Sequence, residues 1–191
     1  MTQTTHIERI RNGIDTDRLY ATLDALHADP SLARFRFCAR NHWIHGAHSR
    51  STIREYHTGG HEDRSREEEF VLEAGEPDVL LGKDTGPSPA EHLLHALAAC
   101  LTTSLVYVAA ARGVHLTAVE STVEGNIDLL GALGLEDERR NGFELIRASF
   151  RIEGEASEDT LREIAEQARR RSAVLGVVAN GVPVAVDVTT A

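Results

Sequence analysis

Hydrophobic positions recur with two different spacings along the chain, and each spacing predicts one type of element. Alternation of apolar and polar residues indicates strands, and apolar residues three or four apart indicate helices. Helices are predicted over 15–28, 89–113, 157–171 and 172–180. Strands are predicted in two stretches after Phe35 that turn near His45–Gly46, and over 70–75, 116–127, 143–154 and 182–188. Charged or acidic loops are expected over 59–69 and 128–141. This order of elements indicates an α+β fold class rather than a doubly wound sheet.

The longest apolar run, "HLLHALAACLTTSLVYVAAARG" over 92–113, has one cysteine, Cys100, at its middle. The run is about as long as a membrane span, which needs roughly 20 residues. It carries His92, His95 and three hydroxyl residues, however, and its many alanines add little hydrophobicity. We therefore expect a central helix of the protein core, beginning near Pro89 and ending at Gly113.

Composition and charge exclude several classes of protein. The 191 residues are 41% hydrophobic and 26% charged, which is typical of one globular domain with an appendage. A formal net charge of −10 argues against nucleic acid or anionic membranes as partners. Cys38 and Cys100 form neither a disulfide framework nor a CxxC site, and the N-terminus lacks the apolar core of a signal peptide. A cytoplasmic location is expected.

The segment "GPSPAEHLLHALAACLTTSL" over 86–105 resembles the signature of the OsmC/Ohr family, in which a proline-containing turn opens a central helix that carries a cysteine. Agreement continues through "FELIRASFRIEG" over 143–154 to the closing "NGVPVAVDV", and a hairpin upstream also fits. The resemblance covers roughly residues 34–188. It implies an OsmC-like domain over 34–191, preceded by an N-terminal helical extension over 1–33.

The resemblance also implies an assembly and an activity. Family members are intertwined homodimers in which β-sheets wrap around long central helices. Their enzymes reduce organic or inorganic hydroperoxides without a cofactor: a cysteine in the central helix attacks the peroxide and becomes a sulfenic acid, and a second cysteine resolves it as a disulfide. An arginine from the N-terminal hairpin and a glutamate near the cysteine helix hold the thiolate and the peroxide oxygen. This chemistry needs a thiolate, because the thiol form does not attack.

Two positions of this sequence correspond to the two cysteines of the family. Cys100 takes the peroxidatic place, and Ser172 occupies the place of the resolving cysteine. A serine cannot form a disulfide, so an external thiol must resolve a sulfenic acid at Cys100. The alternative for Ser172 is a helix N-cap that takes no part in the chemistry.

The arginine and the glutamate are less closely matched. Arg50 in "HSRSTI" is the best candidate, with Arg54 and Arg40 behind it. Glu91 stands nine residues before Cys100, where the family has its glutamate at ten, and on a straight helix this spacing places it nearly opposite the cysteine. Glu91 could instead stabilise the first turn of the helix through the dipole, and Arg50 could be a solvated strand residue.

Two further interpretations remain open. Cys38 could be a small buried residue, or a resolving thiol if a swapped hairpin carries it to Cys100. Histidines crowd the hairpin and the helix and could hold zinc or nickel, although no motif fixes their geometry: His42, His45, His48, His57, His61, His92 and His95. The function expected first is hydroperoxide reduction. The alternatives are a non-catalytic dimer that binds an apolar small molecule or senses oxidants, and a metal-binding protein.

Overall fold

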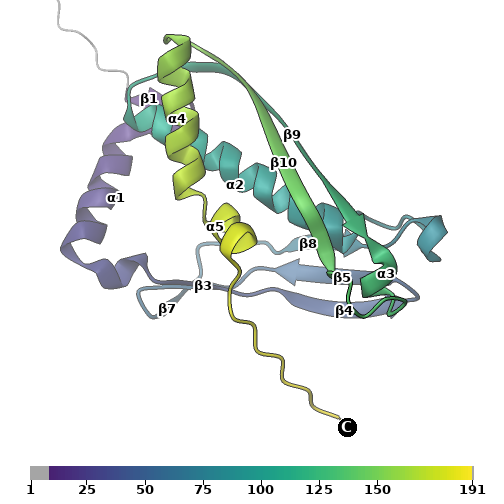
Figure 1. The fold of residues 1–191 in the computed structure, drawn as a ribbon. Coiled ribbons are helices and arrows are strands. Elements are labelled where there is room, and N and C mark those ends of the chain that lie inside the picture. Colours follow the sequence, from purple (N-terminus) through teal and green to yellow (C-terminus); the bar gives the residue numbers. More distant parts are fainter. Residues whose placement is uncertain (1–8, 191) are drawn as a thin grey trace, which may run out of the picture. The chain divides into compact units, whose positions relative to one another are not determined.

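The computed structural model describes residues 9–190, which form two compact units. The first unit contains Arg9 and residues 15–93, and the second contains residues 10–14 and 94–190. The first eight residues of the expected N-terminal extension lie outside the described residues. The boundary expected at residue 33 does not coincide with this division; as a limit of the family domain it stays a prediction. Helices and strands occur in both units, so the predicted α+β class is confirmed (Figure 1).

The first unit begins with helix α1, Thr16–Ala28, which confirms the helix predicted over 15–28. Asp15 is its N-cap, because its carboxylate accepts a hydrogen bond of 3.0 Å from the amide of Arg18. The short 3₁₀ helix η1, Pro30–Ala33, follows directly. A second one, η2, spans Asp78–Leu80.

The first unit also contains two antiparallel sheets. Strands β4 (Arg40–His45), β5 (His48–Ile53) and β8 (Phe70–Ala74) pair in the order β4-β5-β8. The turn expected near His45–Gly46 is confirmed between β4 and β5. Strands β3 (Phe35–Phe37), β6 (Tyr56–Thr58) and β7 (His61–Asp63) form the other sheet. β7 lies inside the segment expected to be a charged loop, because pairing with β6 overrides its polar composition.

Helix α2, Pro89–Ala111, enters the second unit at Leu94 and begins at the predicted Pro89, but it ends shortly before the predicted Gly113. Gly113 has φ +75°, a left-handed conformation that suits glycine at the end of a helix. The amide of Val114 then donates to the carbonyl of Ala109 over 2.9 Å, which closes the helix. Two short strands, β1 (Ile10–Arg11) and β2 (Ile14–Asp15), pair with each other near the start of the described chain.

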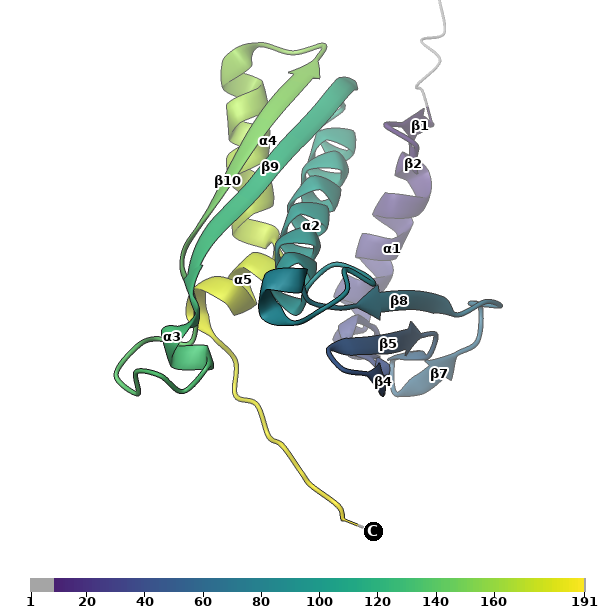
Figure 2. The same cartoon turned by 90° about the vertical axis from the view of Figure 1, so that its right-hand side faces the viewer.

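Strands β9 (Leu116–Asp128) and β10 (Gly142–Gly154) form a long antiparallel ribbon (Figure 2). Their ends agree closely with the predicted strands. The segment between them, expected to be an acidic loop, contains the one-turn helix α3, Leu129–Ala132. The carboxylate of Asp128 caps this turn by accepting from the amide of Leu130 over 2.9 Å.

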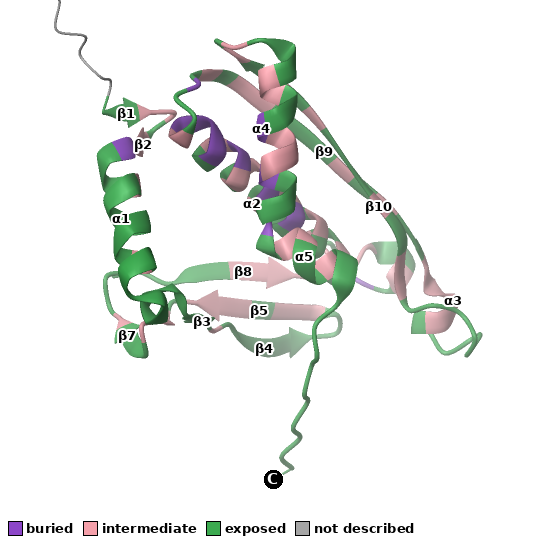
Figure 3. Ribbon diagram, turned by 60° about the vertical axis from the view of Figure 1, so that its left-hand side comes forward, coloured by how far each residue is buried: buried purple, intermediate pink, exposed green. Residues whose placement is uncertain are grey.

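Helices α4 (Glu158–Arg171) and α5 (Ala173–Asn180) complete the second unit. Ser157 caps α4, as predicted, by accepting from the amide of Thr160 over 3.2 Å. The core lies where α2 and α4 pack against the β9–β10 ribbon, and buried residues gather on these helices (Figure 3). Its members are Leu105, Val108, Ala109, Val114, Ile164 and Ala168.

The strand predicted over 182–188 is wrong for this chain, because the structure has no strand after α5 up to residue 190. Figure 2 shows this segment running on as an extended tail. Its alternating valines favour an extended backbone, but a strand also needs a neighbour to pair its amides and carbonyls. Val184, Val186 and Val188 are each about four-fifths exposed, at 78%, 81% and 82%.

Helix α2 is the one helix of the described residues that is long and apolar enough to cross a membrane by length and composition. The core helix of a globular protein meets the same criteria. Leu105, Val108 and Ala109 on this helix are buried against Ile164 and Ala168 of α4. This packing agrees with the prediction that α2 is a helix of the protein core.

Candidate functional site

The structure places Cys100 beside Ser172, although 71 residues separate them along the chain. Cys100 lies on α2 and is half-buried, and Ser172 stands between α4 and α5 and is only 5% exposed. The hydroxyl of Ser172 donates to Sγ of Cys100 over 3.2 Å. Both residues belong to the second unit, so this contact depends on its internal packing alone.

The hydroxyl of Ser172 donates directly to the sulfur of Cys100, and three further donors near this thiol also affect its pKa. Burial of the thiol raises its pKa, and the Ser172 hydroxyl, the amides of Val174 and Ala173 and the Ser104 hydroxyl lower it. The donors together outweigh burial, so the pKa of Cys100 lies below its ordinary value. Such an environment is typical of reactive cysteines and differs from that of inert buried ones.

Three of these donors were missed by the analysis of the sequence. Ser104 follows Cys100 by four residues, a spacing that places both side chains on one face of a helix, so the sequence did contain this signal. The amides of Ala173 and Val174 belong to the first turn of α5. The first amides of a helix have no partner within the helix, and they were predictable only once Ser172 was placed beside Cys100.

Arg50 lies on β5 in the first unit, directly opposite Glu73 on β8. Its Nε donates to the Glu73 carboxylate over 2.7 Å, and Nε2 of His48 lies 2.7 Å from the other carboxylate oxygen. The hydrogen bonds from His48 and then Arg50 hold the pKa of Glu73 below its ordinary value. Nε2 of His92, in the first turn of α2, lies 3.0 Å from the backbone carbonyl of Glu73. These contacts hold Arg50 in a defined position on the hairpin.

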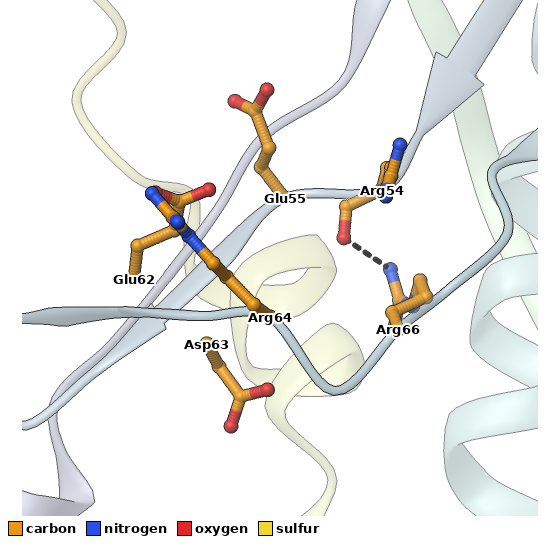
Figure 4. A pocket seen from close by; sticks show the side chains of 6 residues that line it. All are labelled: Arg54, Glu55, Glu62, Asp63, Arg64 and Arg66. Atoms are coloured by element: carbon orange, nitrogen blue, oxygen red, sulfur yellow. Dashed lines mark hydrogen bonds and ion pairs between the residues drawn. The ribbon is translucent and has the colours of Figure 1, made fainter.

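The other two candidate arginines have separate surroundings in the first unit. Nη2 of Arg40 donates to Glu55 over 2.7 Å. Arg54 lines a surface pocket of about 340 Å³ whose other lining residues are also charged, and its carbonyl accepts from Arg66 over 3.2 Å (Figure 4). The guanidinium of Arg66 also lies over the rings of Tyr56 and Phe70, at 5.3 and 4.9 Å. This pocket is lined by charged side chains, and no cysteine lines it.

Glu91 forms a capping box with Ser88 at the start of α2. Its carboxylate accepts from the amide and the hydroxyl of Ser88, at 2.7 and 2.9 Å, and its own amide donates to the Ser88 hydroxyl over 3.3 Å. These bonds also hold the pKa of Glu91 below its ordinary value. Glu91 therefore stabilises the first turn of α2, which is the structural role that the sequence analysis gave as the alternative. Its role in catalysis stays a prediction.

Cys38 and the histidines do not form a site together in the described part of the chain. Cys38 is a free, half-buried thiol between β3 and β4, in the first unit. Within residues 9–190, no three His, Cys, Asp or Glu side chains are grouped so that they could hold a metal ion. His48 is paired with Glu73, and His57 lies 3.1 Å from Nη2 of Arg36. The metal-binding hypothesis thus has no geometric support among these residues.

Residues 82–187, more than half of the chain, match the family model described as OsmC-like protein. The chain belongs to the OsmC-like family. The match includes both Cys100 and Ser172. That Ser172 occupies the place of the family's second cysteine stays a prediction. Among curated protein sequences, none matches this chain.

Solved structures show the same fold. A protein from Psychrobacter arcticus, ascribed to the osmotic stress and detoxification response, has a TM-score of 0.56 at 14% identity, over 75% of this chain and 88% of its own. An OsmC-like protein from Mycoplasma pneumoniae has a TM-score of 0.55 at 16% identity, over 76% and 88%. The organic hydroperoxide resistance protein OsmC from Legionella pneumophila has a TM-score of 0.51 at 14% identity, over 76% and 90%. The OsmC-like fold predicted from the sequence is confirmed.

Proposed function

We propose that this OsmC-like protein reduces hydroperoxides at Cys100 and that an external thiol restores the enzyme. The observation that carries the proposal is the set of donors around Sγ of Cys100, which lowers the pKa of a half-buried thiol. A thiolate is the form that attacks a peroxide, and donors fixed before the reaction stabilise it without rearrangement. The description of the Legionella relative as an organic hydroperoxide resistance protein supports this class of substrate.

The reaction proceeds in two stages. The Cys100 thiolate attacks one peroxide oxygen, the O–O bond breaks, and the alcohol leaves after taking a proton, so that Cys100 becomes a sulfenic acid. An external thiol then attacks the sulfur, water leaves, and a mixed disulfide forms. A second thiol attacks this disulfide and releases Cys100. In sum, one hydroperoxide and two thiols give one alcohol, one water and one external disulfide.

An external thiol is required because no second sulfur is at hand in the second unit. Ser172 occupies the position next to Cys100 and cannot form a disulfide. Cys38, the only other cysteine of the sequence, belongs to the first unit. No resident cofactor or metal takes part in this scheme.

The proposed assembly is an intertwined homodimer. All nine buried hydrophobic residues of the described chain lie in the second unit, so the sheets of the first unit have no buried core of their own. Large side chains on these sheets are more than half exposed, among them Phe37 at 72%, Trp43 at 75% and Phe70 at 58%. A second copy of the chain is the partner that the family fold offers for such a surface.

We also propose a cytoplasmic location, where free thiols stay reduced.

Turnover of a hydroperoxide by purified protein tests the proposal. With cumene hydroperoxide and a small thiol in excess, we expect the wild type and Cys38→Ser to consume peroxide, and Cys100→Ser to be inactive. The matched pair is informative because both changes replace one free cysteine by serine. Wild type that consumes no more peroxide than Cys100→Ser would contradict the proposal and favour a non-catalytic binding or sensing protein.

A further inference from the structure

The hydroxyl of Ser172 has a fixed direction. Its oxygen accepts a hydrogen bond of 3.2 Å from the amide of Leu175, as the N-cap of α5. A hydroxyl has a single proton, and the amide of Leu175 occupies one of its two acceptor positions. The proton is then free to point at the other contact, Sγ of Cys100 at 3.2 Å. The capping bond thus orients the donor toward the sulfur.

Burial makes this contact specific. Ser172 is one of two buried polar residues of the described chain, at 5% exposure. A buried hydroxyl keeps its internal partners because water does not compete for them, and in a medium of low polarity a bond to a charged acceptor is stronger than in water. The thiolate benefits more than the neutral thiol, since a negative sulfur is the better acceptor.

We propose that Ser172 is a positioning residue that holds Cys100 as a thiolate, so that a hydroxyl donor stands where other family members have their resolving thiol. The inference rests on the proposed function at Cys100 and adds to it the means by which the thiolate forms. In this arrangement, serine in place of the second cysteine has two consequences. It removes the internal disulfide step and adds a donor to the attacking sulfur.

A helix cap alone would produce the same contacts with Leu175, so the test must separate the two roles. Ser172→Ala removes both the cap and the donor. Ser172→Asp keeps a good capping acceptor but has no proton to give, and it places a negative charge beside the sulfur. Ser172→Thr keeps both functions. Ser157→Ala is the matched control, because it removes a serine N-cap from α4, in the same unit and away from Cys100.

The measurement is the rate of alkylation of Cys100 by iodoacetamide as a function of pH, followed by peptide mass spectrometry in a Cys38→Ser background. The rate falls as the pH drops through the pKa of the thiol, because the sulfur binds a proton. We expect the wild-type inflection below about 8.5, the value of an unperturbed cysteine. Loss of one hydrogen bond to the thiolate should raise the pKa of Cys100 by about one unit. The alkylation rate of Ser172→Ala should therefore have its inflection at a pH about one unit higher than that of the wild type. Since a more basic thiolate is also more nucleophilic, the rate at pH 6.5 should fall about threefold.

The other variants complete the test. Ser172→Asp should have an inflection at least as high as that of Ser172→Ala despite its intact cap, and Ser172→Thr and Ser157→Ala should resemble the wild type. Equal inflections in the wild type, Ser172→Ala and Ser172→Asp would overturn the proposal and leave Ser172 as a cap. If Ser172→Ala does not fold, the comparison of Ser172→Asp with Ser172→Thr decides. No peroxide enters this measurement, so its outcome is independent of whether the protein turns over hydroperoxide.

Discussion

Oγ of Ser172 lies 3.2 Å from Sγ of Cys100, so the side chain at position 172 is in direct contact with the sulfur. Two bonded sulfurs are about 2.05 Å apart, so a cysteine at position 172 needs a shift of about one ångström. Ser172→Cys should therefore form an intramolecular disulfide with Cys100 when peroxide is added, and a reductant should restore both thiols. Peptide mapping under non-reducing conditions measures this.

The control for this variant is Ser157→Cys, which places a new thiol at the other serine cap of the second unit. It should remain free under the same treatment. If the thiol introduced at 172 also stays free while Cys100 oxidises, the geometry of the α4–α5 junction would be wrong.

Arg50 is the arginine that we expect to act on the peroxide. Its guanidinium is held by Glu73, and a rigid planar donor suits a peroxide oxygen. Arg50→Ala should lower the second-order rate constant of Cys100 with hydroperoxide by about 100-fold, the effect typical of one lost transition-state donor. Stopped-flow kinetics measures it, and Arg54→Ala is the matched control. Equal rates for Arg50→Ala and the wild type would move the role to Arg40 or Arg54, or remove it.

Glu91 should contribute mainly to the stability of α2. Glu91→Ala breaks the capping box with Ser88 and should lower the free energy of unfolding by about 1 kcal/mol in urea. Glu91→Gln can form the same box, so its stability should be close to that of the wild type. Its peroxide rate should also be unchanged, because Glu91 lies nine residues before Cys100, on the opposite side of the helix. A clear loss of rate in Glu91→Gln would instead assign a catalytic role to the carboxylate.

The helices of this chain could be predicted well because their ends are determined locally. Asp15 and Ser157 each accept from an amide three residues later in their own helix, and these contacts depend on neighbouring residues only. Strands could be predicted less well. The segment 182–188 has the alternation of a strand but no partner within the described chain, and β7 has little alternation but pairs with β6.

The residues of the candidate site also differ in how far local sequence determines their contacts. Cys100 and the position of Ser172 were found through the resemblance to a family, and Ser104 could have been found from helix periodicity. The pairing of Arg50 with Glu73 depends on the register of β5 and β8, which are distant in sequence. No local pattern contains that information.

The exposed sheets and the valine tail predict a homodimer in solution. Analytical ultracentrifugation at micromolar concentration should give about twice the mass of 20.9 kDa of one chain. Hydrogen exchange should then show residues 182–188 protected, because an alternating segment without a partner among residues 9–190 of its own chain can pair with a second copy. A monomer whose tail exchanges freely would contradict the proposed assembly.

The most direct test of the account is the identification of the sulfur that reacts with peroxide. Wild-type protein is treated with one equivalent of cumene hydroperoxide in the presence of dimedone, and the labelled peptide is identified by mass spectrometry. Because the donors around Cys100 lower the pKa of that thiol, we predict a sulfenic acid adduct on Cys100 and none on Cys38. The adduct should persist in Cys38→Ser and disappear in Cys100→Ser. An adduct on Cys38 alone, or no adduct in the wild type, would contradict the account.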